Sequence, residues 1–147
     1  MRPNRFKRSK YNATPTYAVE ELDGSIFLVA EKEATEQQKR RGIRFHSWAE
    51  ADRYTLLRSE QRAGLIVDLE LQPPYECRVN SVLVTTYNAD FRYKRAGKVV
   101  VEDVKGMETD VYELKKKLVE AIYNVYVKEI KPRAKPRVKK AKPKLSD

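Results

Sequence analysis

The run VVVEDVKG at residues 99–106 is the stretch that most restricts the fold, because four valines in six positions are typical of a buried β-strand. Side chains alternate across a strand, so Asp103 and Lys105 share one face while Glu102 lies on the other. An acid and a lysine two residues apart on one face indicate either the exposed polar end of a strand or a functional site. The preceding segment helps to decide between the two.

A turn at residues 95–97 precedes this strand, so residues 84–94 are expected to pair with it as a β-hairpin. Asp90 then lies opposite Glu102 or Asp103, with Cα atoms ~5 Å apart. Two carboxylates ~4 Å apart repel by roughly 4 kcal/mol at an effective dielectric constant near 20. A cation or protonation relieves this repulsion. Oxygen ligands with open water positions suit Mg²⁺, and Mn²⁺ is expected to substitute for it.

This cluster of acids and a lysine suits the hydrolysis of phosphodiesters. A metal ion polarises the phosphoryl oxygen and lowers the pKa of the attacking water. Lys105 can orient that water, help to deprotonate it, and place positive charge where negative charge develops. The alternative is that Asp103 and Lys105 form a surface ion pair at a strand end and that Asp90 is a solvated acid beside a turn.

The rest of the chain alternates between strand and helix patterns. Asp23-Gly24 is a strong hairpin signal, and residues 31–41 are either a short exposed helix or a linker. Ser47 and Glu50 form a capping box that begins a helix, which Gly64 ends. A second helix is expected at residues 109–126, and further strands at 65–72, 75–93 (with a turn at Asn80-Ser81) and 125–130. The apolar face of the second helix is expected to consist of Val111, Leu114, Leu118 and Ile122.

These patterns predict an α/β fold with one central mixed, largely antiparallel β-sheet flanked by helices. A length of 147 residues suits one domain with a modest core. The expected organisation is a flexible basic arm at 1–16, a hairpin and short helix at 17–42, a catalytic core at 43–130 and a disordered Pro/Lys tail at 131–147. Residues 17–130 make up the folded domain.

The basic character of the chain is concentrated in its two ends. Residues 1–10 contribute +5 and residues 131–147 contribute +7 to the net charge of +10, which leaves −2 for residues 11–130. Such segments suit a polyanion, and nucleic acid is the first expectation. Solubilising tails, or a ribosome-like or anionic-lipid contact, are the alternatives.

Several other classes of protein are not supported by the sequence. No apolar run approaches the ~20 residues that a membrane span needs, and the basic N-terminus lacks the apolar core of a signal peptide. The lone Cys77 excludes an internal disulfide and a cysteine zinc cluster. We therefore expect a cytoplasmic protein, with no membrane partner.

Two motif groups resemble those of known nucleases. NADF (88–91) followed by EDVKG (102–106) resembles the paired motif of PD-(D/E)XK nucleases, and FHSWAE (45–50) resembles the first-helix motif of phage endonucleases that resolve branched DNA. Together with DLELQP, these segments are similar to a family of small phage-encoded endonucleases over residues 43–120. Two departures exist: Ala89 replaces the proline of the motif, and Asp103 stands where glutamate is commoner.

The resemblance implies a restriction-endonuclease-like core and a Mg²⁺-dependent endonuclease. Its substrate would be branched or Holliday-junction DNA in phage replication and recombination, in the host cytoplasm. It makes Asp90, Asp103 and Glu50 the metal ligands, and Lys105 the fourth catalytic residue. Cutting two strands would need a partner subunit, so a homodimer is expected.

Other residues are candidates for supporting roles. Glu70 or Gln72 is a candidate for the site or the scissile phosphate, and His46 for a phosphate contact, although an exposed polar face for the first two and a structural or solvated role for His46 are the simpler explanations. Glu102 is expected to be a salt-bridge partner. Contacts to the DNA backbone are expected from Arg5, Lys7, Arg8, Lys115, Lys116, Lys117, Lys139 and Lys140.

Two other functions remain open from the sequence. One is a non-catalytic nucleic-acid-binding protein that uses its basic arms, and the other is a structural or ribosome-associated protein. In either case Glu50 would need no role beyond capping its helix, and the lysines of the last helix would form a solvated face.

Overall fold

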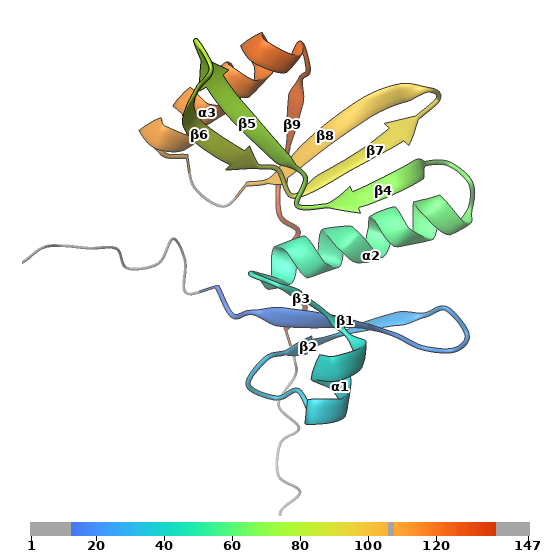
Figure 1. The fold of residues 1–147 in the computed structure, drawn as a ribbon. Helices are drawn as coiled ribbons and strands as arrows, with labels where there is room; N and C mark the ends of the chain where they lie inside the picture. The colour runs from blue at the N-terminus through green and yellow to red at the C-terminus, as the bar shows by residue number, and fades with distance from the viewer. Residues whose placement is uncertain (1–12, 106–107, 138–147) are drawn as a thin grey trace, which may run out of the picture.

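The computed structural model describes residues 13–105 and 108–137, and over these residues the fold is α/β, as predicted (Figure 1). Three helices and three β-sheets make up this part of the chain. In order along the chain, the elements are β1 Thr16–Glu20, β2 Ile26–Ala30, α1 Glu36–Arg41, β3 Ile43–Phe45, α2 Trp48–Arg62, β4 Val67–Leu71, β5 Pro74–Val79, β6 Val82–Asn88, β7 Phe91–Arg95, β8 Lys98–Val104, α3 Asp110–Tyr123 and β9 Val127–Ile130.

The largest sheet is mixed and largely antiparallel, in the order β4-β7-β8-β9. The valine-rich strand β8 lies inside it, antiparallel to β7 and parallel to β9. Strands β2-β1-β3 form a second sheet, and β5-β6 form a third. The expectation of one sheet was therefore wrong, because the N-terminal hairpin recruits β3, and β5 and β6 pair only with each other in the described chain.

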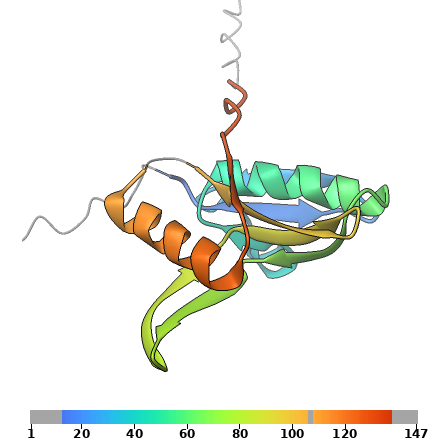
Figure 2. The ribbon, with the colours of Figure 1, turned by 90° about the horizontal axis from the view of Figure 1, so that it is seen from above.

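Two hydrophobic cores lie on opposite faces of the central sheet. On one face, α2 packs between the central sheet and the three-stranded sheet (Figure 1), with a cluster that includes Phe45, Leu57 and Phe91. On the other face, α3 packs against the β5-β6 hairpin, which projects from the body in Figure 2. Strand β8 contributes Val101 to this second core. Side chains of β8 therefore point alternately to the two faces of the sheet, as predicted.

Helix α2 begins at the predicted cap, Ser47, but the predicted capping box forms only in part. The Ser47 hydroxyl accepts a hydrogen bond from the Glu50 backbone N–H (3.2 Å), which satisfies one free donor of the first turn. The Glu50 carboxylate accepts from the backbone N–H of His46 (3.3 Å), one residue before the cap. The capping contact therefore leaves Glu50 at the N-terminal end of α2, where it also reaches the site described below.

The chain changes sheets at Ala89 and Asp90. We expected one strand over 84–94, but β6 ends at Asn88 and β7 begins at Phe91. The break arises because β6 pairs with β5 and β7 pairs with β8. At the break, the Ala89 N–H donates to the Pro73 carbonyl (3.2 Å). A proline at position 89 could not make this bond.

Helix α3 buries a different face from the one predicted. Val111 and Leu114 are 64% and 60% exposed, whereas Tyr112 and Val119 are buried. The expected apolar stripe was therefore wrong. Polar contacts from the other face orient the helix: Lys115 Nζ donates to the Thr86 carbonyl (3.3 Å). Thr109 caps the helix, since its hydroxyl accepts a hydrogen bond from the Tyr112 N–H (3.2 Å).

The described part of the C-terminal tail is anchored at its start. Residues 131–137 have no regular secondary structure. Arg133 nevertheless donates two hydrogen bonds to the largely buried carboxylate of Asp52 in α2, at 2.8 and 2.6 Å. The beginning of the tail is thereby held against α2. None of the helices in residues 13–105 and 108–137 combines the length and apolar character that crossing a bilayer requires.

Candidate active site

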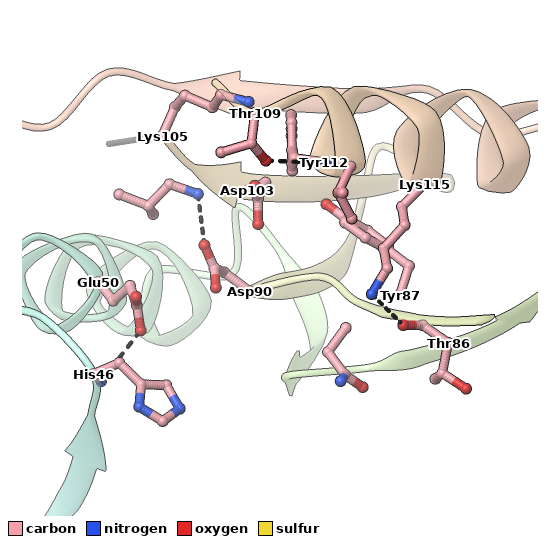
Figure 3. A pocket seen from close by; sticks show the side chains of 13 residues that line it. His46, Glu50, Thr86, Tyr87, Asp90, Asp103, Lys105, Thr109, Tyr112 and Lys115 are labelled. Atoms are coloured by element: carbon pink, nitrogen blue, oxygen red, sulfur yellow. Dashed lines mark hydrogen bonds between the residues drawn. The ribbon is translucent and has the colours of Figure 1, made fainter. Parts of the chain in front are cut away.

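A cavity of about 410 Å³, here called the acid pocket, opens between α2, the end of β6, the β7-β8 pair and α3 (Figure 3). The four residues that the sequence singled out as catalytic all line it. Its lining residues are His46, Glu50, Thr86, Tyr87, Asn88, Asp90, Asp103, Val104, Lys105, Thr109, Val111, Tyr112 and Lys115. Segments far apart in sequence therefore meet at one site.

Asp90 and Asp103 face each other, as the sequence predicts. Phe91 pairs with Glu102 in the β7-β8 ladder, so position 90 comes opposite position 103. The Asp90 carboxylate accepts a hydrogen bond from the backbone N–H of Val104 (2.6 Å), shown as a dashed line in Figure 3. This bond fixes the carboxylate beside the end of β8. The turn at 95–97 thus sets the register that brings the two acids together.

The electrostatics of this pair are unfavourable for two negative charges. Burial raises the pKa of Asp90 to about 8, and the charges of Asp103 and Glu50 add to the effect. A hydrogen bond with Asp103 also favours the protonated form of Asp90, while the Val104 N–H opposes it. These effects favour the protonated form of Asp90 when no cation is present.

Glu50 belongs to the same electrostatic cluster. Burial raises the pKa of Glu50, and the charge of Asp103 acts in the same direction, while His46 lowers it. Glu50 therefore combines a capping contact with a place in the pocket. His46 lines the pocket too, so the structure brings this candidate to the site as well.

Lys105 lies in the pocket, but its ammonium group turns toward α3 (Figure 3). Its Nζ is 2.9 Å from the centre of the Tyr112 ring and 3.9 Å from the Glu129 carboxylate. Within the described residues, this buried nitrogen has no hydrogen-bond partner. A buried ammonium without hydrogen bonds is costly. An anionic group such as a phosphate would satisfy it.

Residues that the sequence reasoning missed support Lys105. Glu129 lies beside Asp103 in the parallel β8-β9 ladder. It accepts hydrogen bonds from Lys116 Nζ (3.0 Å) and from the Tyr112 hydroxyl (3.3 Å). The predicted last strand was the only available signal for Glu129. The spacing of Tyr112, three residues after the Thr109 cap, gave no hint that its ring covers Lys105.

Tyr87 is a second neighbour of the acids that was missed. Burial raises its pKa strongly, and the charges of Asp103, Tyr112 and Asp90 add to the effect. Its buried hydroxyl has no hydrogen-bond partner in the part of the chain that the structure describes. The hydroxyl therefore stays protonated and can donate a hydrogen bond beside the acid pair.

Other predicted residues lie outside the acid pocket. The Glu70 carboxylate forms an ion pair with Arg92 on β7. Only the backbone N–H of Gln72 reaches the site, donating to the Asp90 carbonyl (2.9 Å). Asp68 in β4 and Gln72 just after it have positive φ angles (56° and 50°), and the pairing of β4 with β7 shifts register between Val67 and Glu70, so the strand expected at 65–72 does not alternate regularly.

Among the predicted DNA contacts, Lys115 lines the pocket, Lys116 binds Glu129 and Lys117 is exposed. The remaining predicted contacts lie outside the described residues: Arg5, Lys7, Arg8, Lys139 and Lys140. The salt-bridge role expected for Glu102 is confirmed, since Arg53 binds it through two hydrogen bonds (2.8 and 2.6 Å).

The donor set suits a hard divalent ion. Mg²⁺ is commonly held by one or two carboxylates, with water and substrate phosphate oxygens completing its shell, and Asp90 with Asp103 supplies such a pair. No group of three or more His, Cys, Asp or Glu side chains among the described residues is placed to hold a metal. The role of Glu50 as a third ligand stays a prediction.

Comparison with known proteins adds a family but no activity. Residues 30–136 match the model of a family described as "Protein of unknown function (DUF1064)". No curated protein and no solved structure matches the chain. The matched segment contains every residue that lines the acid pocket.

Proposed function

The chain belongs to the DUF1064 family, and we propose that it is a metal-dependent endonuclease that hydrolyses phosphodiester bonds in DNA. One observation carries the proposal: two half-buried aspartates, Asp90 and Asp103, line a single cavity together with Glu50 and Lys105. A protein that only binds nucleic acid has no use for two like charges held close together and partly shielded from water, because their repulsion destabilises the fold. A divalent cation between the two carboxylates would relieve this repulsion and would itself be bound.

Each residue has a distinct role in this proposal. Asp90 and Asp103 would hold the ion, and Glu50 would complete the site or hold a water. When bound, the ion supplies Lewis-acid polarisation of the phosphoryl group and a more acidic water. Lys105 would donate from Nζ to the scissile phosphate, where negative charge develops, or orient the attacking water. The Tyr112 ring and Glu129 hold Lys105 at the edge of the pocket.

The substrate class follows from the motif resemblance to PD-(D/E)XK nucleases. We propose branched DNA, such as Holliday junctions formed in phage replication and recombination, with action in the host cytoplasm. Cutting two strands requires two active sites, so the enzyme would act as a homodimer. Mg²⁺ would be the ion, with Mn²⁺ as a substitute.

One observation favours a second function, a non-catalytic nucleic-acid-binding protein. The two ends of the chain carry +5 and +7 while the rest is slightly acidic, and basic segments bind phosphate backbones without catalysis. In that case Asp90→Ala and Asp103→Ala would leave the biological activity intact, and Mg²⁺ would bind without measurable heat.

A cleavage assay tests the proposal. Folded protein is incubated with four-way junctions, flaps and linear duplex in Mg²⁺ or Mn²⁺, alongside Asp103→Asn, which keeps the shape of the side chain and removes its charge. We expect cleavage of a branched substrate and a loss of roughly 10³-fold or more in the variant, since charge stabilisation of the transition state is a large term. If folded wild-type protein cleaves none of these substrates, the proposal that it is an endonuclease is refuted.

Calorimetric titration with Mg²⁺ is the control. Heat of binding is expected for the wild type and should disappear in Asp103→Asn. Heat that is unchanged in the variant would place the ion elsewhere on the chain.

A further inference from the structure

A second cavity of about 410 Å³, here called the flanking pocket, lies next to the acid pocket. The two cavities share His46, Glu50 and Val104 in their linings. A ligand that places a charged group among the acids therefore has its neighbouring group within reach of the second cavity.

The lining of the flanking pocket differs from that of the acid pocket. Five of its lining residues are apolar, namely Ala13, Trp48, Ala49, Val104 and Pro132, and the other five are Thr14, His46, Ser47, Glu50 and Lys135. Trp48 is the first residue of α2, is half-buried, and is the single tryptophan of the chain. An apolar cavity with one large aromatic ring suits a flat group with an apolar face. A nucleobase is such a group, and it stacks on aromatic side chains in single-strand-binding proteins.

The charge around the flanking pocket also suits nucleic acid. Ala13 and Thr14 bring the N-terminal segment to the cavity, directly after residues 1–10 with their five basic side chains. Pro132 and Lys135 bring the tail, where residues 131–147 carry eight. Both basic segments therefore join the folded body at this cavity. Lys135 supplies positive charge at the cavity for a phosphate next to a bound base.

The anchoring of the tail fixes this arrangement. Arg133 lies between the two tail residues that line the cavity, and its paired hydrogen bonds to Asp52 (2.8 and 2.6 Å) hold it on α2. Asp52 lies one helical turn beyond Trp48. The tail wall of the cavity and the aromatic ring are therefore carried by the same helix.

We propose that the flanking pocket binds one unpaired nucleobase next to the scissile phosphate by stacking it on Trp48. The base must be unpaired because a base inside a duplex stack cannot enter a cavity without being extruded. The pocket would thus select strands with exposed bases, as at flaps and junctions. The position of the scissile phosphate rests on the proposed function, whereas the binding of the base is tested without catalysis.

The single tryptophan reports directly on this cavity. Full-length protein is titrated, without divalent ions, with a flap DNA and with the same flap made abasic in its unpaired arm, which keeps the phosphates and removes the bases. We expect quenching of Trp48 fluorescence by the normal flap and affinity on the order of 10- to 100-fold higher than for the abasic one. Fluorescence anisotropy of labelled DNA gives the affinities.

Three variants sharpen the test. Trp48→Ala should bind normal and abasic flaps equally, while Trp48→Phe should keep most of the preference because phenylalanine still stacks. Tyr126→Ala removes a 72% exposed aromatic residue that lines neither cavity, and it should behave as wild type. A preference that disappears equally in the Tyr126 and Trp48 variants would overturn the proposal.

Other results would also overturn it. Saturating binding with unchanged Trp48 fluorescence means that no base reaches the ring. Failure of acrylamide to quench Trp48 in the free full-length chain means that the chain itself covers the cavity. The nuclease is judged separately: cleavage in Mg²⁺ without base-dependent quenching refutes the pocket alone, and quenching without cleavage supports the pocket while refuting the nuclease.

Discussion

Two neighbouring acids on β8, Glu102 and Asp103, lie on opposite faces of the sheet and have different partners. Glu102 points toward α2 and is fully buried. There it accepts two hydrogen bonds from Arg53 (2.8 and 2.6 Å) and a third from the Tyr93 hydroxyl. Burial and this hydrogen bond raise the pKa of Tyr93 to about 12, so the tyrosine stays a donor. The fold itself supplies the cation for Glu102.

Asp103 points to the other face and meets a second carboxylate. Burial, Asp103 and Glu50 together raise the pKa of Asp90, while the nearby ammonium of Lys105 lies against Tyr112 and Glu129. Glu102 has Arg53 as its cation within the fold and holds elements together. Under the proposed function, the half-buried pair of Asp90 and Asp103 binds an external cation instead.

The largest expected effect is on stability, and it tests whether Glu102 is a structural acid. Glu102→Gln leaves the Arg53 charge buried without its counter-ion, so we expect a loss of roughly 3–5 kcal/mol in unfolding free energy. For a chain of this length that is a fall in Tm on the order of 10 °C. Thermal denaturation followed by circular dichroism measures it.

The matched control is Asp103→Asn, which should not lower Tm. The double variant Arg53→Met/Glu102→Leu should recover much of the loss, because it removes both buried charges. Equal destabilisation by Glu102→Gln and Asp103→Asn would mean that both acids have the same structural role.

A smaller effect concerns pH and the acid pair. The pKa of Asp90 in the folded protein is about 8, above its ordinary value of 3.8, so the folded state holds more protons than the unfolded state between these values. The contribution of Asp90 to stability is therefore lost as pH rises from about 4 to 8. Asp90→Asn removes the penalty and should stabilise the protein at pH 8 without divalent ions, by roughly 1–3 kcal/mol.

Urea denaturation in EDTA at several pH values measures this difference. The gain from Asp90→Asn should shrink toward pH 4. Mg²⁺ should stabilise the wild type more than the variant, because only the wild type binds the ion well in its folded state. A variant that is less stable at every pH would show that the aspartate is structural, like Glu102.

The smallest expected effect is on the salt dependence of DNA binding, and it concerns the C-terminal tail. Changing Lys139, Lys140, Lys142 and Lys144 to glutamine keeps the Arg133–Asp52 anchor. We expect the log–log slope of DNA affinity against salt to fall by roughly 0.9 for each phosphate that the substituted lysines no longer neutralise. Tm and cleavage at low salt should not change. An unchanged slope would show that these lysines do not bind the DNA backbone.

Local signals in the sequence were sufficient for several parts of the fold and the site. Ser47 and Thr109 cap their helices, and Asn80-Ser81 turns the β5-β6 hairpin, where both residues have positive φ angles (47° and 65°). The pairing of Asp90 with Asp103 followed from one tight turn. These predictions succeed because capping and turn formation depend on residues a few positions apart.

Other features depended on which segments met in three dimensions. The break at Ala89 requires β5 as a partner for β6, and the buried face of α3 requires the hairpin and Glu129. The flanking pocket requires Trp48, Ala13 and Pro132 to come together from three parts of the chain.

The sequence by itself determined the helices α2 and α3, the alternation of β8 and the turn that brings Asp90 close to the acids of β8, because these depend on backbone geometry and near neighbours. Only the tertiary structure decided that Glu102 would be neutralised by Arg53 and that Asp103 would face Asp90 in a cavity. The physical reason is that the partner of a buried charge is chosen by packing between distant segments. Local sequence does not encode that choice.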